Sequence, residues 1–101
     1  MTGPPETATI LLASIALEPN RWKKQAQRVP SFRVSEWGDQ VAAAGFDGWE
    51  LWENHFLLAD DAERRALRDG SLPVTVFNTY QRPGIDPLGD WLPVVEALSF
   101  L

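Results

Sequence analysis

The segment from residue 41 to residue 55 constrains the fold of this chain most strongly. It reads VAAAGFDGWELWENH. Small residues suited to a helix end on Gly45, which favours the left-handed conformation of a helix stop. An apolar strand at 48–52 and a polar run at 53–55 follow at once. This order is typical of one half-unit of a parallel α/β fold, in which functional groups lie at the carboxyl ends of the strands.

The same order of elements recurs along the chain. Apolar runs predict further strands at 9–17 and 74–77, and a helical pattern follows each strand. The repeat is about thirty residues, the length of one β-α unit. Because successive strands joined by crossover helices run parallel, the sequence predicts an α/β fold with a parallel sheet.

Capping residues predict where the helices begin. Ser35 is expected to cap the first helix, the Asp60–Asp61 pair the second, and Asp90 the third, which would place Pro93 in the first turn. The third helix is expected to bury Leu92, Val95, Leu98 and Phe100. Residues 18–34 form a long connection, and such connections in compact domains are usually functional.

The chain reads as part of a larger barrel. It stops at Leu101 within an apolar helical run, and a three-stranded sheet leaves two edges unpaired. A (β/α)8 barrel needs about 250 residues. We therefore expect residues 9–101 to be the first three βα units of an incomplete TIM barrel, and residues 1–8 to be a disordered lead-in. A self-sufficient three-unit α/β sandwich is the alternative.

Composition and charge disfavour several kinds of function. Fourteen acidic and nine basic residues give a net charge of −5, and the scattered basic residues argue against a nucleic-acid partner. The chain has no cysteine, which excludes disulfides and zinc–thiolate sites. The apolar run from Ile10 to Leu17 is too short to span a membrane, and no basic secretory start precedes it. We expect a cytoplasmic protein with no membrane partner.

Polar residues follow each predicted strand at its carboxyl end. Parallel strands bring these ends to one rim of the sheet, so the side chains are expected to lie close together. Glu53 is, with Glu18, a candidate ligand or metal contact. The residues that we predict to bind a substrate are Glu18, Asn20, Glu50, Trp52, His55, Asn78 and Tyr80.

Glu50 is a carboxylate in the middle of an apolar strand. Strand alternation puts Glu50 and Trp52 on one face, and Trp49 and Leu51 on the face that packs against helices. Glu50 would then project into the barrel interior, where a charge is costly unless a cation or hydrogen-bond donors hold it. It is either a partner in a structural ion pair or a carboxylate close to the substrate.

His55 and Tyr80 are the only histidine and tyrosine in the chain. An imidazole at this rim could bind a sugar hydroxyl or move a proton during ring opening, and a phenol could donate to a ligand hydroxyl. The simpler readings are an exposed loop histidine and a tyrosine that covers the rim. No residue is assigned a catalytic role. The spacing of the carboxylates and the histidine does not indicate a metal site within this chain, and there is no glycine-rich phosphate loop.

Three segments together resemble the start of the xylose isomerase-like TIM barrels, the sugar phosphate isomerases and epimerases. These are ALEPNRW at 16–22, AGFDGWELWENH at 44–55 and VFNTY at 76–80. Within the second, Glu50 falls on the strand-two glutamate of that family. The resemblance covers residues 9–101 and three of the eight units.

The resemblance implies a divalent metal, Mn, Mg or Zn, in the full-length enzyme. Its ligands in that family come from later strands, and two metal-bound glutamates move a proton between adjacent carbons through an enediolate. Those positions are not in this chain, so we expect it to bind no metal and to be inactive alone. The related DNA-repair branch holds three metals with several histidines, and a single histidine argues against it.

We therefore expect the N-terminal portion of a sugar (phosphate) isomerase or epimerase of carbohydrate metabolism, acting on a sugar or polyol. Two alternatives are open. One is a lyase or dehydratase on the same barrel. The other is a non-catalytic α/β module that binds a partner, including a second copy, through its open sheet edges.

Overall fold

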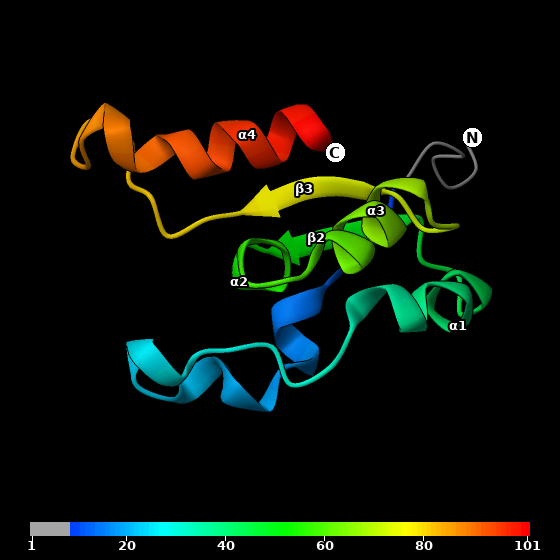
Figure 1. Ribbon diagram of the computed structural model, residues 1–101. Coiled ribbons are helices and arrows are strands. Elements are labelled where there is room, and N and C mark those ends of the chain that lie inside the picture. Colours follow the sequence, from blue (N-terminus) through cyan, green and yellow to red (C-terminus); the bar gives the residue numbers. More distant parts are fainter. Residues whose placement is uncertain (1–8) are drawn as a thin grey trace, which may run out of the picture.

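The computed structural model describes residues 9–101, and the predicted lead-in at 1–8 lies outside them. Three strands form one parallel sheet in the order β1-β2-β3: β1 (Leu11–Ala13), β2 (Gly48–Trp52) and β3 (Val74–Asn78) (Figure 1). The register pairs Leu12 with Trp49 and Leu51 with Phe77. The prediction of an α/β fold with parallel strands is confirmed. The carboxyl ends of all three strands therefore lie at the same end of the sheet.

Within residues 9–101, four α-helices and five short 3-10 helices connect and cover the strands. The α-helices are α1 (Gly38–Ala43), α2 (Asn54–Leu57), α3 (Asp61–Asp69) and α4 (Leu92–Phe100). The 3-10 helices are η1 (Ser14–Leu17), η2 (Pro19–Trp22), η3 (Gln25–Gln27), η4 (Val34–Trp37) and η5 (Leu88–Trp91). Among the described residues no helix has the length and apolar character needed to span a bilayer.

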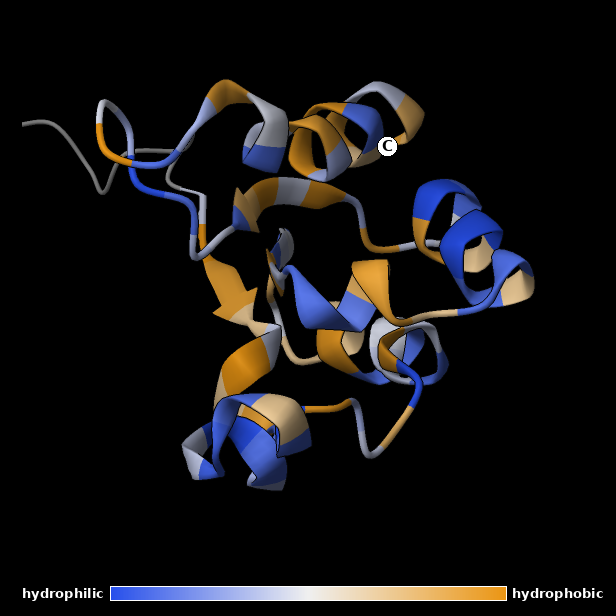
Figure 2. Ribbon diagram, turned by 60° about the vertical axis from the view of Figure 1, so that its left-hand side comes forward, coloured by the Kyte–Doolittle hydropathy of each residue, from blue (hydrophilic) through white to orange (hydrophobic). Residues whose placement is uncertain are grey.

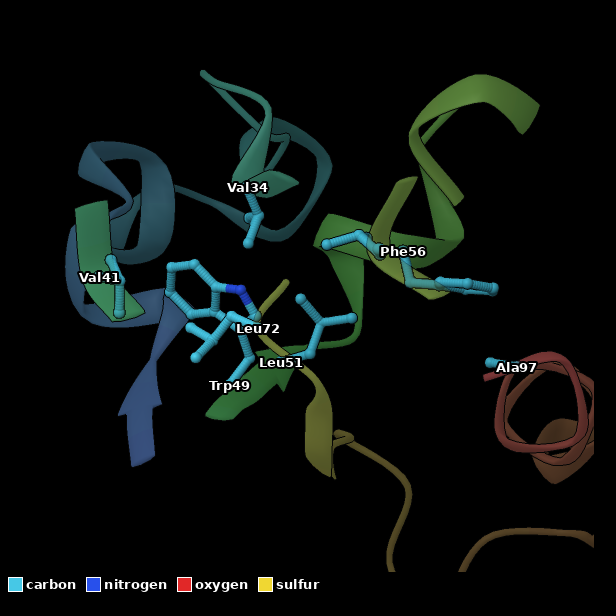
Figure 3. Packing of buried hydrophobic residues seen from close by; sticks show 8 residues of the cluster. Val34, Val41, Trp49, Leu51, Phe56, Leu72 and Ala97 are labelled. Atoms are coloured by element: carbon cyan, nitrogen blue, oxygen red, sulfur yellow. The ribbon is translucent and has the colours of Figure 1, made fainter. Parts of the chain in front are cut away.

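The core lies on the sheet face that carries Trp49 and Leu51. Both side chains are fully buried, and they point toward the helices in Figure 3. The remaining buried members of this cluster come from η4, from the four α-helices and from the loop before β3: Val34, Val41, Phe56, Leu67, Leu72 and Ala97. Glu50 lies on the other face and is partly exposed. The predicted alternation along β2 is confirmed.

The first strand is much shorter than the predicted 9–17. It ends at Ala13, and Ser14 begins the 3-10 helix η1. The hydroxyl Oγ of the buried Ser14 accepts a hydrogen bond of 2.9 Å from the backbone N–H of Trp52. A side-chain oxygen thus takes the position that the next strand carbonyl would occupy. Because this bond satisfies the N–H of Trp52, β1 can turn away from the sheet.

Two of the predicted helix caps are wrong. Ser35 does not cap α1, because both its N–H and its hydroxyl donate to the buried carboxylate of Glu63 on α3. Asp90 does not cap α4, which begins after Trp91 and a turn of 3-10 helix, although Pro93 does fall in the first turn. The second cap is confirmed, since Asp60 accepts the N–H of Glu63.

The predicted buried face of α4 is also wrong in part. Val94 and Ala97 are buried, whereas Leu92, Val95 and Leu98 are each more than half exposed. Figure 2 shows hydrophobic residues around much of this helix, which is why the apolar pattern did not select a face. Phe100 is half-buried and packs against Phe56 of α2, with ring centroids 5.8 Å apart. This contact fixes which side of α4 meets the core.

Candidate functional site

A buried hydrogen-bonded chain joins the carboxyl ends of β1 and β2. The Nδ1 atom of His55 lies 2.8 Å from Ser14 Oγ, and Nε2 lies 3.0 Å from Glu18 Oε1. All three side chains are at most 2% exposed. An ionised carboxylate only accepts hydrogen bonds, so the geometry assigns the proton of a neutral ring to Nε2, with Nδ1 accepting from Ser14. The polar residues after the first two strands do meet, as the sequence predicts.

Glu18 also joins the long connection at residues 18–34 to the buried hydrogen-bonded chain. Its Oε1 also accepts the N–H of Ser31 at 2.8 Å, and its Oε2 accepts the N–H of Asn20 at 3.1 Å. Burial by itself raises the pKa of Glu18, but hydrogen bonds from Ser31, His55 and Asn20 outweigh it, and the net pKa is lowered. Glu18 is therefore ionised at neutral pH and holds the loop in place.

His55 is neutral in the folded protein. Burial lowers its pKa from the ordinary 6.5, and the neighbouring Glu18 only partly offsets that effect. Its ring packs between two aromatic side chains, with centroids 5.1 Å from Phe32 and 5.0 Å from Trp52. The imidazole thus contacts two aromatic rings and is hydrogen-bonded at both nitrogens.

Ser14, His55 and Glu18 stand in the order of a nucleophile, a base and a carboxylate. That arrangement needs a hydroxyl that a substrate can reach. Ser14 is 0% exposed and its oxygen already accepts the N–H of Trp52. The hydrogen-bonded chain of Ser14, His55 and Glu18 therefore acts as a structural link that sets the position of this rim of the sheet.

A second polar group joins the carboxyl ends of β2 and β3. Glu53 is 6% exposed, and its Oε1 accepts the backbone N–H of Tyr80 and the hydroxyl of Thr79. The indole N–H of Trp52 donates to the Tyr80 hydroxyl at 3.0 Å. The other carboxylate oxygen, Glu53 Oε2, accepts no hydrogen bond from any residue in the range 9–101.

Glu53 lines a cavity of about 580 Å³ at this rim. The size is within the range of small-molecule sites, roughly 300–1,000 Å³. The cavity lies between η3 with its following loop, the start of α2 and the loop after β3. The residues around it are mostly polar: Gln25, Ala26, Arg28, Val29, Glu53, Asn54, Leu58, Tyr80 and Gln81.

Arg28 and Asn54 shape one wall of the cavity. The Nε of Arg28 donates to the carbonyl of Lys23 at 2.7 Å, and the guanidinium carbon lies 5.9 Å from the centroid of the Tyr80 ring. The Asn54 amide donates to the Arg28 carbonyl at 2.7 Å. The terminal nitrogens of Arg28 make no hydrogen bond or ion pair within the described part of the chain. The cavity thus offers both donors and acceptors beside an aromatic ring.

The predicted substrate-binding residues fall into two groups. Of the seven, only Tyr80 lines the cavity, and Trp52 donates its indole N–H to the Tyr80 hydroxyl. The other five lie outside the cavity lining. Glu18 and His55 belong to the buried hydrogen-bonded chain, and Asn20 lies in the connection that Glu18 holds in place. Glu50 lies on the open face of the sheet, and Asn78 is exposed at the end of β3. The Asn78 carbonyl accepts the N–H of Glu53 at 2.9 Å.

Sequence reasoning missed two residues of this rim. Ser14 is a lone hydroxyl within the apolar run from Ile10 to Leu17, and such a hydroxyl is a signal for a buried hydrogen bond. Arg28 gave no such signal, because only the folded connection places it over Tyr80. The sequence predicts Glu53 as a ligand or metal contact, although Glu53 is not one of the predicted substrate-binding residues.

Residues 9–101 contain no group of three or more His, Asp or Glu side chains that could hold a metal ion. The nearest combination, Glu18 with His55, already uses its oxygens and ring nitrogens on protein partners. This pair therefore offers a metal ion no free ligand, and the divalent metal that the family resemblance implies would take its ligands from outside residues 9–101.

No protein-family model matches the chain, and no curated protein or solved structure shows significant similarity to it. The family is therefore a prediction from the three sequence segments.

Proposed function

We propose that this protein binds a small polyhydroxylated molecule, a sugar or a polyol, at the carboxyl ends of β2 and β3. One observation carries the proposal. Glu53 lines a cavity of about 580 Å³, and its Oε2, which accepts no hydrogen bond from the described residues, is open to solvent. A carboxylate oxygen with free lone pairs beside a cavity favours a ligand that brings hydroxyl donors to it.

The other walls of the cavity suit the same ligand. The half-exposed ring of Tyr80 offers an apolar face on which the C–H side of a sugar can pack. Gln25, Gln81 and Asn54 carry amides that both donate and accept, which matches hydroxyl groups. An apolar ligand would leave Glu53 and these amides without partners, and would bind more weakly.

The proposed reaction class is that of a sugar isomerase or epimerase. Support comes from the parallel strands, from polar groups at all three strand ends, and from the resemblance of the segments at 16–22, 44–55 and 76–80. In that class residues 9–101 would form one wall of the substrate site. They would orient hydroxyls through Glu53 and cover one side of the ligand with the Tyr80 ring. Strands that carry metal ligands would have to come from outside these residues.

Binding can be tested by titrating the protein with a panel of aldoses, ketoses and acyclic polyols, and measuring heat by calorimetry. We expect saturable binding that Glu53→Gln and Tyr80→Ala both weaken, about tenfold for the loss of the charged acceptor. Cyclohexanol, a ring of similar size with one hydroxyl, is the control ligand and should bind much more weakly. Absence of saturable binding by every member of the panel would rule the proposal out.

The matched control variant is Glu36→Gln. Glu36 is an exposed carboxylate at the start of the helical segment before α1, away from the cavity lining. The substitution changes the net charge by the same amount as Glu53→Gln. It should leave the affinity unchanged, and an equal loss from both variants would mean that overall charge, not the cavity carboxylate, drives binding.

A further inference from the structure

We propose that the ligand of the cavity beside Glu53 carries a carboxylate as well as hydroxyl groups, and that Arg28 binds this carboxylate. The inference rests on the proposed polyol site and narrows its ligand to a polyhydroxy acid. It is supported by the charge of one cavity wall, by the free donors of the Arg28 guanidinium, and by the absence of an ion pair between Arg28 and Glu53.

The connection that forms one wall of the cavity is basic. Residues 19–35 contain five basic side chains and no acidic one, although the whole chain has nine basic and fourteen acidic residues. Arg33 pairs with Asp60. The other four basic residues of the connection form no ion pair within residues 9–101: Arg21, Lys23, Lys24 and Arg28. A wall of one sign beside a cavity attracts a ligand of the opposite charge.

The guanidinium of Arg28 is held in place while its terminal nitrogens stay free. Its Nε donates to the carbonyl of Lys23 at 2.7 Å, and the Asn54 amide donates to the backbone carbonyl of Arg28 at 2.7 Å. The terminal nitrogens Nη1 and Nη2 have no partner among the described residues. Together they form the planar fork that binds both oxygens of a carboxylate. Because the side chain is already anchored through Nε, it loses little conformational freedom when a ligand binds.

Arg28 and Glu53 line the same cavity, and no ion pair joins them. The carboxylate of Glu53 accepts the N–H of Tyr80 and the hydroxyl of Thr79 instead. The cavity therefore has a charged acceptor from one segment and a charged donor from another. A ligand with hydroxyl groups at one end and an ionised acid at the other supplies a partner to both.

A carboxylate suits this cavity better than a phosphate does. It carries a single charge, which one guanidinium can neutralise. A phosphate monoester carries nearly two charges at pH 7, and it would share the cavity with the carboxylate of Glu53. The sequence also has no glycine-rich loop whose N–H groups could surround a phosphate. A neutral polyol would leave the fork of Arg28 to water.

Calorimetric titration with matched pairs of ligands tests the inference. Each pair is an aldonate and its alditol: gluconate with glucitol, galactonate with galactitol, and xylonate with xylitol. The two members of a pair differ only at one end, where a carboxylate replaces a hydroxymethyl group. We expect at least one aldonate to bind about tenfold more tightly than its alditol, because a charge-assisted fork of hydrogen bonds is gained.

Arg28→Gln should abolish this preference for the aldonate and leave the affinity for the alditol unchanged. The unchanged alditol affinity also shows that the cavity of the variant is intact. Lys24→Gln is the matched control, because it removes a positive charge from the same connection at an exposed position outside the cavity lining. It should keep the preference. Equal losses from the two variants would attribute the preference to the overall charge of the connection and overturn the role of Arg28.

The outcomes separate this inference from the polyol site on which it rests. If each alditol binds as tightly as its aldonate and Glu53→Gln weakens both, the polyol site stands and the carboxylate is wrong. If glucitol 6-phosphate binds more tightly than gluconate and Arg28→Gln removes that advantage, the acid group is a phosphate, which also overturns the carboxylate. If no aldonate or alditol binds, the inference fails together with the polyol site.

Discussion

The imidazole Nε2 of His55 lies 3.0 Å from Oε1 of Glu18, in a place where neither side chain reaches solvent. The two residues are 37 positions apart in sequence. One follows β2 and the other follows β1, so their contact joins two strand ends. Because Glu18 also accepts N–H groups from Asn20 and Ser31, the same contact sets the conformation of the loop that carries Arg28 to the cavity.

Replacing His55 with alanine should destabilise the fold by about 3 kcal/mol. Glu18 and Ser14 would each lose a buried hydrogen-bond partner, and the space between Phe32 and Trp52 would be left empty. Urea unfolding measures the change. Ser99→Ala removes an exposed hydroxyl from α4 and serves as the control, with an expected change within about 0.5 kcal/mol. Equal effects from the two variants would show that the buried chain does not support the fold.

Stability should fall in two stages as the pH is lowered. The folded state keeps His55 neutral with a pKa below 6.5, so acid first favours the unfolded chain as the pH drops through 6.5. Glu18 has a folded pKa below 4.5, so its contribution is present above that pH and is lost as the pH falls toward the folded value. Thermal unfolding measured from about pH 8 to about pH 3 would show both stages, because this range brackets the ordinary pKa values of histidine and glutamate.

His55→Gln separates the two stages. The amide cannot gain a proton in this range, so the decline that begins near pH 6.5 should disappear while the decline below 4.5 persists. A variant that retains the first stage would assign it to another group.

Replacing Tyr80 with phenylalanine should cost about 1–2 kcal/mol, even though Tyr80 itself is half exposed. The phenol oxygen is the acceptor for the indole N–H of Trp52, and Trp52 is buried. Removing the acceptor leaves that N–H without a partner. Unfolding by urea, followed by tryptophan fluorescence, reports the loss. A change no larger than that of Ser99→Ala would mean that water replaces the phenol.

The sequence predicted the parts of the fold that local chemistry determines. Gly45 has φ 101°, as the helix stop requires, and the alternation of Trp49, Glu50 and Leu51 selected the buried face of β2. Prediction from the sequence failed where a residue far away in the sequence decides the local structure. Ser35 pairs with Glu63 rather than capping a helix, and Phe56 selects the side of α4 that is buried. The cavity wall depends on Arg28, whose place follows from the bonds of Glu18 to the loop.

Gly45→Ala should destabilise the protein by about 1 kcal/mol, because alanine in a left-handed conformation is strained. Space is not the cause, since an added Cβ at Gly45 would meet no atom within 4 Å. Gly89 is the matched control, with equally open surroundings and no positive φ. Gly89→Ala should be neutral or slightly stabilising. A neutral Gly45→Ala variant would contradict the assigned backbone conformation.

The measurement that tests the polyol site most directly is an NMR titration that follows the backbone amide of Tyr80, whose N–H donates to Glu53. We predict a saturable shift of this resonance when the best ligand of the sugar and polyol panel is added. The shift should be lost in Glu53→Gln and kept in Glu36→Gln. A Tyr80 amide that does not move, or that moves equally in Glu53→Gln, would contradict the assignment of this cavity as the binding site.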